Sequence, residues 1–139
     1  MSGLGRHVKC DNRGQATVEF ALLLMLLLTI TFGAIELGRV LSTWSVVQYA
    51  ARDAARTAAV ECSVDPSCTT AVESRVTAGL GQLPAGSVTR WSMSTGPYTS
   101  GNPVTVRVEH DFIVAVPLIS SVLNTGQITV VGTASMRLE

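Results

Sequence analysis

The feature that most constrains this chain is an uninterrupted apolar run near its N-terminus. From residue 20 to residue 35 every residue is apolar, glycine or threonine, and Glu19 and Glu36 bound the run. These sixteen residues would rise roughly 24 Å as an α-helix, against a bilayer hydrocarbon core of about 30 Å. Extension at both ends makes the helix long enough to span a membrane. We therefore predict a transmembrane part at residues 17–38.

Charges around the run predict its orientation. The nearby basic residues are Arg6, Lys9 and Arg13 on the N-terminal side, offset by Asp11, and Arg39 and Arg52 on the other side. Basic residues favour the cytoplasmic side, so we predict that the N-terminus is inside and that residues 61–139 are outside. The chain has no net charge and its ten Lys and Arg residues are scattered, which argues against a nucleic-acid partner.

Three cysteines flank the run unequally. Cys10 precedes it, whereas Cys62 and Cys68 close the short segment CSVDPSC beyond it. Two cysteines in an exported segment favour a disulfide between Cys62 and Cys68. Free thiols are the first alternative and a metal site is the second. The metal site is disfavoured because His7 and His110 are far away in sequence and there is no second cysteine pair. We expect no metal and no cofactor.

The start of the apolar run carries a resemblance to a known family. The segments RGQATVEFALLL and FGAIELGR resemble the N-terminus of TadE-like proteins, the pseudopilins of tight-adherence, or Flp-type, pilus systems. The similarity continues through AARDAARTAAV and returns in VTVRVEHDFIVAVPLISSVL and ITVVGTASMRLE. Met25 stands where many relatives have a proline. This departure means that a helix kink of the family is not carried over to this position.

This resemblance implies that a prepilin peptidase removes residues 1–14 as a cytoplasmic leader. Cleavage after Gly14 would make Gln15 the mature N-terminus, with Glu19 as its fifth residue and Phe20 as its sixth. Glycine suits the position before the cut, because it lets the backbone lie extended against a protease. A conventional signal-peptide cut is not expected, since cleavage after Ala34 would lack a small residue at the third position before it.

The resemblance also implies a role for Glu19. In pilin-like assemblies a glutamate at this place meets the new terminal ammonium of a neighbouring subunit. A charge in lipid costs several kcal/mol unless it is paired, so such a partner would be favourable. The alternative is that Glu19 is simply solvated among the lipid headgroups.

Beyond the membrane the helix is predicted to continue, covering residues 15–61. Apolar residues recur there at three- and four-residue steps, at Leu37, Val40, Trp44, Val47, Ala51, Ala54, Ala55 and Ala58. Gln48, Arg52 and Arg56 fall on a more polar face. The apolar stripe can pack on the chain's own sheet, on a neighbouring subunit, or on both. Glu36 and Arg39 are spaced to form an ion pair, worth about 0.2–0.5 kcal/mol.

Residues 62–139 are predicted to form a small α+β domain. Thr70 to Glu73 matches a capping box that opens a short helix, with Val72, Val76, Leu80 and Leu83 on its apolar face. Strand patterns follow at residues 88–95, at 104–108 continuing toward Phe112 and Val114, and at 128–138. Pro117 interrupts the second strand, and residues 118–123 are predicted to include a helical turn. The expected fold is a long helix packed on an antiparallel sheet of about three strands.

No catalytic constellation is recognisable, so we expect no enzyme. His110 would be the single candidate base of a triad and is predicted to be an exposed strand residue, although Glu109 and Asp111 flank it. The leading hypothesis is a pseudopilin in the cytoplasmic membrane that acts with the prepilin peptidase, other pilins, the pilus assembly machinery and membrane lipid. The second is an uncleaved single-pass anchor that presents an external binding domain, and the third is an envelope enzyme.

Overall fold

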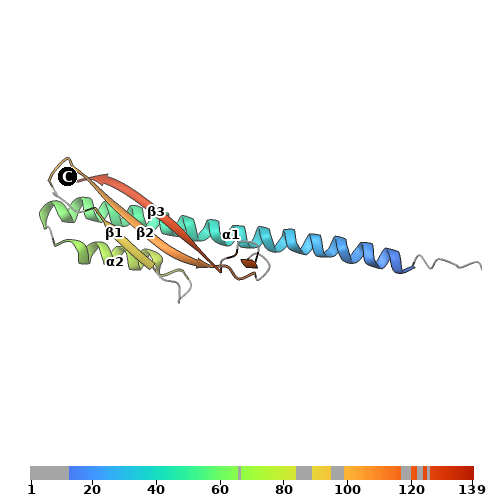
Figure 1. Ribbon diagram of the computed structural model, residues 1–139. Coiled ribbons are helices and arrows are strands. Elements are labelled where there is room, and N and C mark those ends of the chain that lie inside the picture. The colour runs from blue at the N-terminus through green and yellow to red at the C-terminus, as the bar shows by residue number, and fades with distance from the viewer. Residues whose placement is uncertain are drawn as a thin grey trace, which may run out of the picture. The chain divides into compact units, whose positions relative to one another are not determined.

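The computed structural model describes residues 13–65, 67–83, 89–94, 99–116, 120–121, 124 and 126–139. In chain order its elements are α1 (Arg13–Val64), α2 (Thr69–Leu80), β1 (Thr89–Met93), β2 (Pro103–Ile113) and β3 (Gln127–Arg137) (Figure 1). The first twelve residues, Pro66, Pro117 and most of the predicted helical turn at 118–123 lie outside the described residues. The chain divides into two compact units, Met1–Ala34 and Ile35–Glu139.

Helix α1 is a single helix of 52 residues that runs through both units. It begins two residues before the predicted start and ends three residues after the predicted end. Leucine and alanine, which dominate its two halves, are strong helix formers. Its first part contains the candidate membrane span, with a mean hydropathy of 2.3 in its most apolar window.

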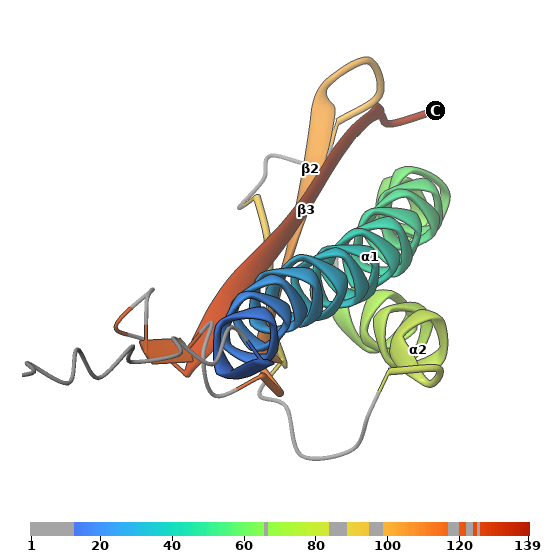
Figure 2. The same ribbon diagram turned by 90° about the vertical axis from the view of Figure 1, so that its right-hand side faces the viewer.

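The three strands form one antiparallel sheet in the order β1-β2-β3, which confirms the predicted α+β fold. Val108 in the middle strand lies opposite Trp91 of β1 and Gly132 of β3. The predicted alternation along β2 is confirmed, since Val104, Val106 and Val108 are fully buried. Figure 2 shows α2 and the part of α1 that follows Ile35 on the same side of the sheet.

The hydrophobic core lies between this side of the sheet and the two helices. On α1 the buried residues of the core cluster are Val47, Ala51, Ala54, Ala55, Ala58, Ala59 and Cys62. Not all of the predicted stripe packs on the chain's own sheet, since Leu37 and Trp44 are 60% and 50% exposed. The helix instead turns Glu36 and Thr43 inward. The three- and four-residue spacing of apolar residues shows that they share one side of the helix. It does not show which neighbouring side of the helix faces the sheet.

Close backbone approach explains two glycines of this unit. A Cβ atom on Gly132 would lie 2.7 Å from the carbonyl oxygen of Val47, so α1 crosses β3 at this point without an intervening side chain. A Cβ atom on Gly79 would lie 2.8 Å from the Cβ of Ala50, where α1 and α2 meet. Glycine weakens a helix or a strand, but at these two positions it allows the close packing that a larger residue would prevent.

Beside Gly132, the side-chain amide of Gln48 covers the edge of β3. Its Nε2 donates to the carbonyl oxygen of Thr133 at 3.0 Å, and its Oε1 accepts from the Thr133 N–H at 3.3 Å. Because β3 is an outer strand, these are backbone groups that no neighbouring strand of this sheet satisfies. Gln48 thus joins α1 to the sheet through a pair of hydrogen bonds.

Helix α2 differs from its prediction at the N-terminus. It begins at Thr69 with Cys68 as its cap residue, and no side chain caps it, so the predicted capping box at Thr70 was wrong. Its apolar face was predicted correctly, since Val72 and Val76 are buried and Leu80 and Leu83 pack against the core.

The opposite side of the sheet is polar. Arg90 of β1 makes ion pairs with Glu109 at 3.5 Å and Asp111 at 3.3 Å, and Arg107 pairs with Glu109 at 2.9 Å. The hydrogen bond from Arg107 is the main reason why the pKa of Glu109 lies below its ordinary value. Glu109 and Asp111 of β2 are thus paired with Arg90 of the neighbouring strand, and Glu109 also with Arg107 of its own strand.

Candidate functional site

The predicted processing junction lies in the first turn of α1. Gly14 and Gln15 are helical, and a Cβ atom on Gly14 would meet nothing within 4 Å. The helix therefore begins before the junction, not after it as predicted. The amide groups of a first turn have no partners within the helix and this turn frays readily, so a protease that needs an extended backbone has only this turn to open.

Glu19 and Gln15 lie together on one face of α1. The Nε2 of Gln15 donates to Oε1 of Glu19 at 2.9 Å, one helical turn apart, and both side chains are exposed. The amide is neutral, so this contact leaves the negative charge of Glu19 uncompensated. Phe20, the next residue, is exposed as well.

Exposed apolar side chains follow Glu19 through the whole first unit. The large ones are Phe20, Leu22, Leu23, Leu24, Met25, Leu26, Leu27, Leu28, Ile30 and Phe32. The two polar side chains in this stretch bond to the helix itself, since the hydroxyls of Thr29 and Thr31 each donate to a carbonyl oxygen four residues earlier at 2.8 Å. A surface of this kind, with its hydroxyl groups satisfied internally, fits a membrane anchor.

Glu36 directly follows the apolar run, but its side chain is buried. It is 5% exposed, and its Oε2 accepts from Nη1 of Arg39 at 2.8 Å, so the predicted ion pair is confirmed. Its Oε1 accepts the N–H of Ala115 at 2.9 Å, just after β2. The guanidinium of Arg39 in turn lies over the ring of Phe112, 5.0 Å from its centroid. Sequence reasoning missed these tertiary contacts, because no local pattern links residues 79 positions apart.

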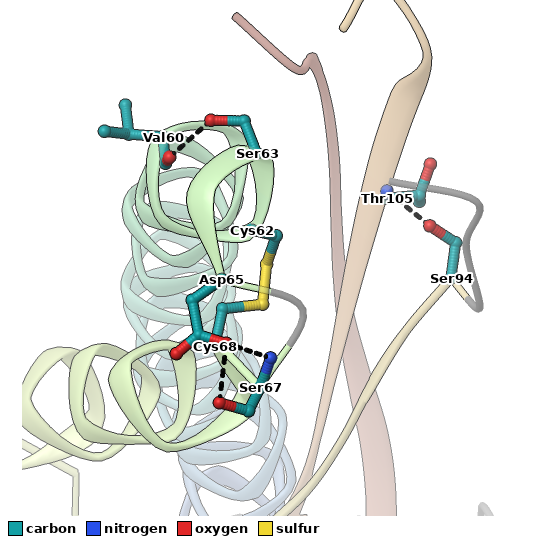
Figure 3. Close-up of a disulfide and its surroundings, with 8 residues drawn as sticks. All are labelled: Val60, Cys62, Ser63, Asp65, Ser67, Cys68, Ser94 and Thr105. Carbon is teal, nitrogen blue, oxygen red and sulfur yellow. Dashed lines mark hydrogen bonds between the residues drawn. A yellow bond between two sulfur atoms is a disulfide. The ribbon is translucent and has the colours of Figure 1, made fainter. Parts of the chain in front are cut away.

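Cys62 and Cys68 form a disulfide that joins the end of α1 to the start of α2 (Figure 3). In the turn between them the carboxylate of Asp65 accepts from the N–H of Ser67 at 2.8 Å and from its hydroxyl at 2.7 Å. These two bonds, the backbone one foremost, lower the pKa of Asp65. The N–H of Cys68 also donates to the carbonyl oxygen of Asp65 at 3.2 Å, so the disulfide and these hydrogen bonds together hold the turn.

His110 was expected to be exposed, and this expectation was wrong. It is 3% exposed on the helix side of the sheet, because the alternation that buries Val106, Val108 and Phe112 also turns His110 inward. Its Nδ1 lies 3.0 Å from the hydroxyl oxygen of Thr89. Burial is the main cause that lowers the pKa of the ring, and the charge of Asp111 partly offsets it.

Within the described ranges no group of three or more His, Cys, Asp or Glu side chains is placed to hold a metal ion. Glu19 belongs to the first unit and Glu36 to the second. Gly14, Gln15, Glu19 and Phe20, the residues predicted for processing and assembly, all lie near the start of α1.

Comparison with known proteins finds a family match in this segment. No curated protein and no solved structure matches the chain. The family model described as TadE-like protein matches residues 14–56, which include the junction, Glu19, the apolar helix and most of its alanine-rich continuation. The chain is therefore similar to the TadE-like family over this part of α1, in agreement with the resemblance predicted from the sequence.

Proposed function

We propose that the chain is a structural pseudopilin, or minor pilin, of a tight-adherence pilus or related secretion system, and that a prepilin peptidase cleaves it after Gly14. The observation that carries the proposal is the extent of the family match, which begins at Gly14 and runs through Glu19, Phe20 and the apolar helix. Cleavage there removes the basic leader and keeps the anchor. Its partners are then the peptidase, other pilins or pseudopilins, the assembly machinery and membrane lipid.

In this proposal Glu19 pairs with the terminal ammonium of a neighbouring mature subunit. Support comes from its surroundings, since Glu19 is exposed and its hydrogen-bond partner in the chain is a neutral amide. An uncompensated carboxylate at the edge of an apolar helix is unfavourable in lipid. A cation that cleavage creates at a similar depth would compensate it.

The proposed orientation places the leader in the cytoplasm and residues 61–139 outside. The pairing of Arg39 with Glu36 supports it, because the first basic residue after the span carries no excess charge. The leader then dominates the balance of positive charge. The disulfide between Cys62 and Cys68 also suits an oxidising compartment outside the cytoplasm.

The proposed role is mechanical and not catalytic. His110, which sequence reasoning treated as the candidate base, is buried in the core beside Thr89. A general base needs hydrogen-bond reach to a substrate proton, and the interior side of the sheet gives His110 no such access.

Mass spectrometry of the protein extracted from its native membranes tests the cleavage. The expected mature chain begins at Gln15, and Gly14→Ala should block or slow its formation. Gly33→Ala is the matched control, because it changes a glycine of the same helix that also has open space around it. A chain that still begins at Met1 or Ser2, in cells with an active prepilin peptidase, would instead support an uncleaved anchor that presents a binding domain.

The pairing role is tested with Glu19→Gln, which keeps the size of the side chain and removes its charge. We expect cleavage to continue and the number of pili, and the cross-linking to other subunits, to fall. Glu61→Gln, an exposed glutamate near the other end of α1, should change neither. Normal pili with Glu19→Gln would end the pairing role and leave the cleavage proposal intact.

A further inference from the structure

Helix α1 keeps an apolar surface after the run that Glu36 ends. Leu37, Leu41 and Trp44 are 60%, 55% and 50% exposed, although they belong to the folded unit Ile35–Glu139. They recur at steps of four and three residues, so they lie on one side of the helix. We name these three residues the juxtamembrane strip.

The charges beside the strip are compensated within the protein. Between Glu19 and Arg52 the chain has two charged residues, Glu36 and Arg39. Both oxygens of the Glu36 carboxylate are hydrogen-bonded, to Arg39 and to the N–H of Ala115. A buried and paired carboxylate does not require water, so Glu36 does not mark the point where the helix must leave the membrane.

The types of residue in the strip identify its surroundings. Tryptophan favours the membrane interface, where its ring meets lipid and its N–H meets water. The side chain of Arg39, 42% exposed above its ion pair, is long enough to reach lipid phosphates. Contacts between membrane helices instead favour small residues, and the strip has two leucines and a tryptophan.

The length of the helix agrees with this assignment. From residue 20 to Trp44 the helix would rise roughly 37 Å. The hydrocarbon core is about 30 Å thick and the bilayer with its headgroups about 40–45 Å. A helix that enters near Phe20 therefore brings Trp44 to the headgroup region of the other side.

We propose that the juxtamembrane strip lies in the lipid interface and holds the folded unit against the outer surface of the membrane. The inference rests on α1 being the membrane anchor of the proposed function, but not on cleavage after Gly14 or on entry into a pilus.

The test uses the full chain in phosphatidylcholine vesicles, with bromine atoms as quenchers at shallow or deep positions of the lipid chains. The protein has two tryptophans, Trp44 and Trp91, so Trp91→Phe leaves Trp44 as the reporter. We expect shallow bromines to quench Trp44 more strongly than deep ones. In the matched control Trp44→Phe, the remaining Trp91 of β1 should not be quenched by either lipid.

A third variant separates failure of the inference from failure of the anchor. Leu27→Trp, made together with Trp44→Phe and Trp91→Phe, reports from the middle of the apolar run and should be quenched most by deep bromines. If this reporter is quenched and Trp44 is not, the strip lies in water or against protein, and the inference is wrong while the anchor stands. If neither is quenched, both are wrong.

Discussion

Helix α1 contains two apolar stretches that differ in the size of their side chains. In the first unit six leucines between residues 22 and 28 are 41–65% exposed. In the second, Ala50, Ala51, Ala54, Ala55 and Ala58 are fully buried. Large side chains suit a fluid lipid environment, whereas small ones allow a helix to approach a sheet and a second helix closely. The two stretches therefore differ both in side-chain volume and in exposure.

We expect the largest effect from a substitution that adds atoms where the buried stretch of α1 meets β3. Gly132→Val would place side-chain atoms against the carbonyl carbon and oxygen of Val47 and the Cα of Gln48, which are backbone atoms. Because backbone cannot rotate away, we expect a loss of about 3 kcal/mol of folding free energy. Thermal unfolding of the full chain in detergent measures it. A melting temperature within about 2 °C of the wild type would contradict the close approach.

The same change from alanine to leucine should affect folding stability differently in the two stretches. Ala54→Leu enlarges a fully buried residue and should cost about 2 kcal/mol through overpacking. Ala21→Leu makes the same change at an exposed position of the first unit and should leave the stability of the folded unit unchanged. Denaturant unfolding followed by near-UV circular dichroism compares the pair. Equal costs would mean that side-chain size does not separate the stretches.

The disulfide tests how firmly the buried stretch is held at its end. Replacing both Cys62 and Cys68 with alanine should lower stability by about 2 kcal/mol, because the bond closes a short loop in the unfolded chain. Reduction of the wild type should produce the same loss, and reduction of the double variant should produce none. Protease accessibility of the turn around Asp65 gives a second measurement. An unchanged stability on reduction would show that hydrogen bonds alone hold the turn.

The smallest expected effect concerns pH and is confined to the folded unit. Burial lowers the pKa of His110 below its ordinary value of 6.5, so folding favours the neutral ring. Above pH 6.5 the ring is neutral in both states, and stability is at its full value. As the pH falls through 6.5 the unfolded chain takes up the proton first, and stability decreases.

Denaturant unfolding at intervals between about pH 7.5 and pH 5.5 measures this decrease, in a range where carboxylates scarcely titrate. In the variant His110→Gln the slope should vanish. Helicity of the leucine-rich stretch in detergent should not change over this range, since its polar groups include no histidine among residues 13–34. A slope that persists in His110→Gln would assign the effect to other groups.

The fold was largely predictable because its patterns are local. The unbroken apolar run and the alanines that follow predict α1, and the alternation of Val104, Val106 and Val108 predicts the inner face of β2. The third strand was predicted within one residue at each end. Each of these elements follows from a repeat in its own segment.

The failures arose where tertiary contacts override a local pattern. The Thr70 box predicts a cap, but Cys68 already has helical dihedral angles next to the disulfide, so the helix starts earlier. His110 is polar by composition but occupies an inward position of a strand. The N–H of Ala115, which the Glu36 carboxylate accepts, lies 79 positions away in sequence, and no spacing rule connects the two residues.

For the candidate site, the order of residues along the chain predicts the junction and the role of Glu19, and both stay predictions. It could not identify the neutral partner Gln15 as a contact, because the rotamers of both side chains decide that bond. The neighbour that Glu19 is proposed to meet belongs to another copy, and pairing between copies stays a prediction.

The amide of Gln48 affects how another chain could pair with the outer edge of β3. At Thr133 it occupies both positions that an incoming strand would use, in the manner of a one-residue strand. Another chain cannot extend the sheet there without first displacing it.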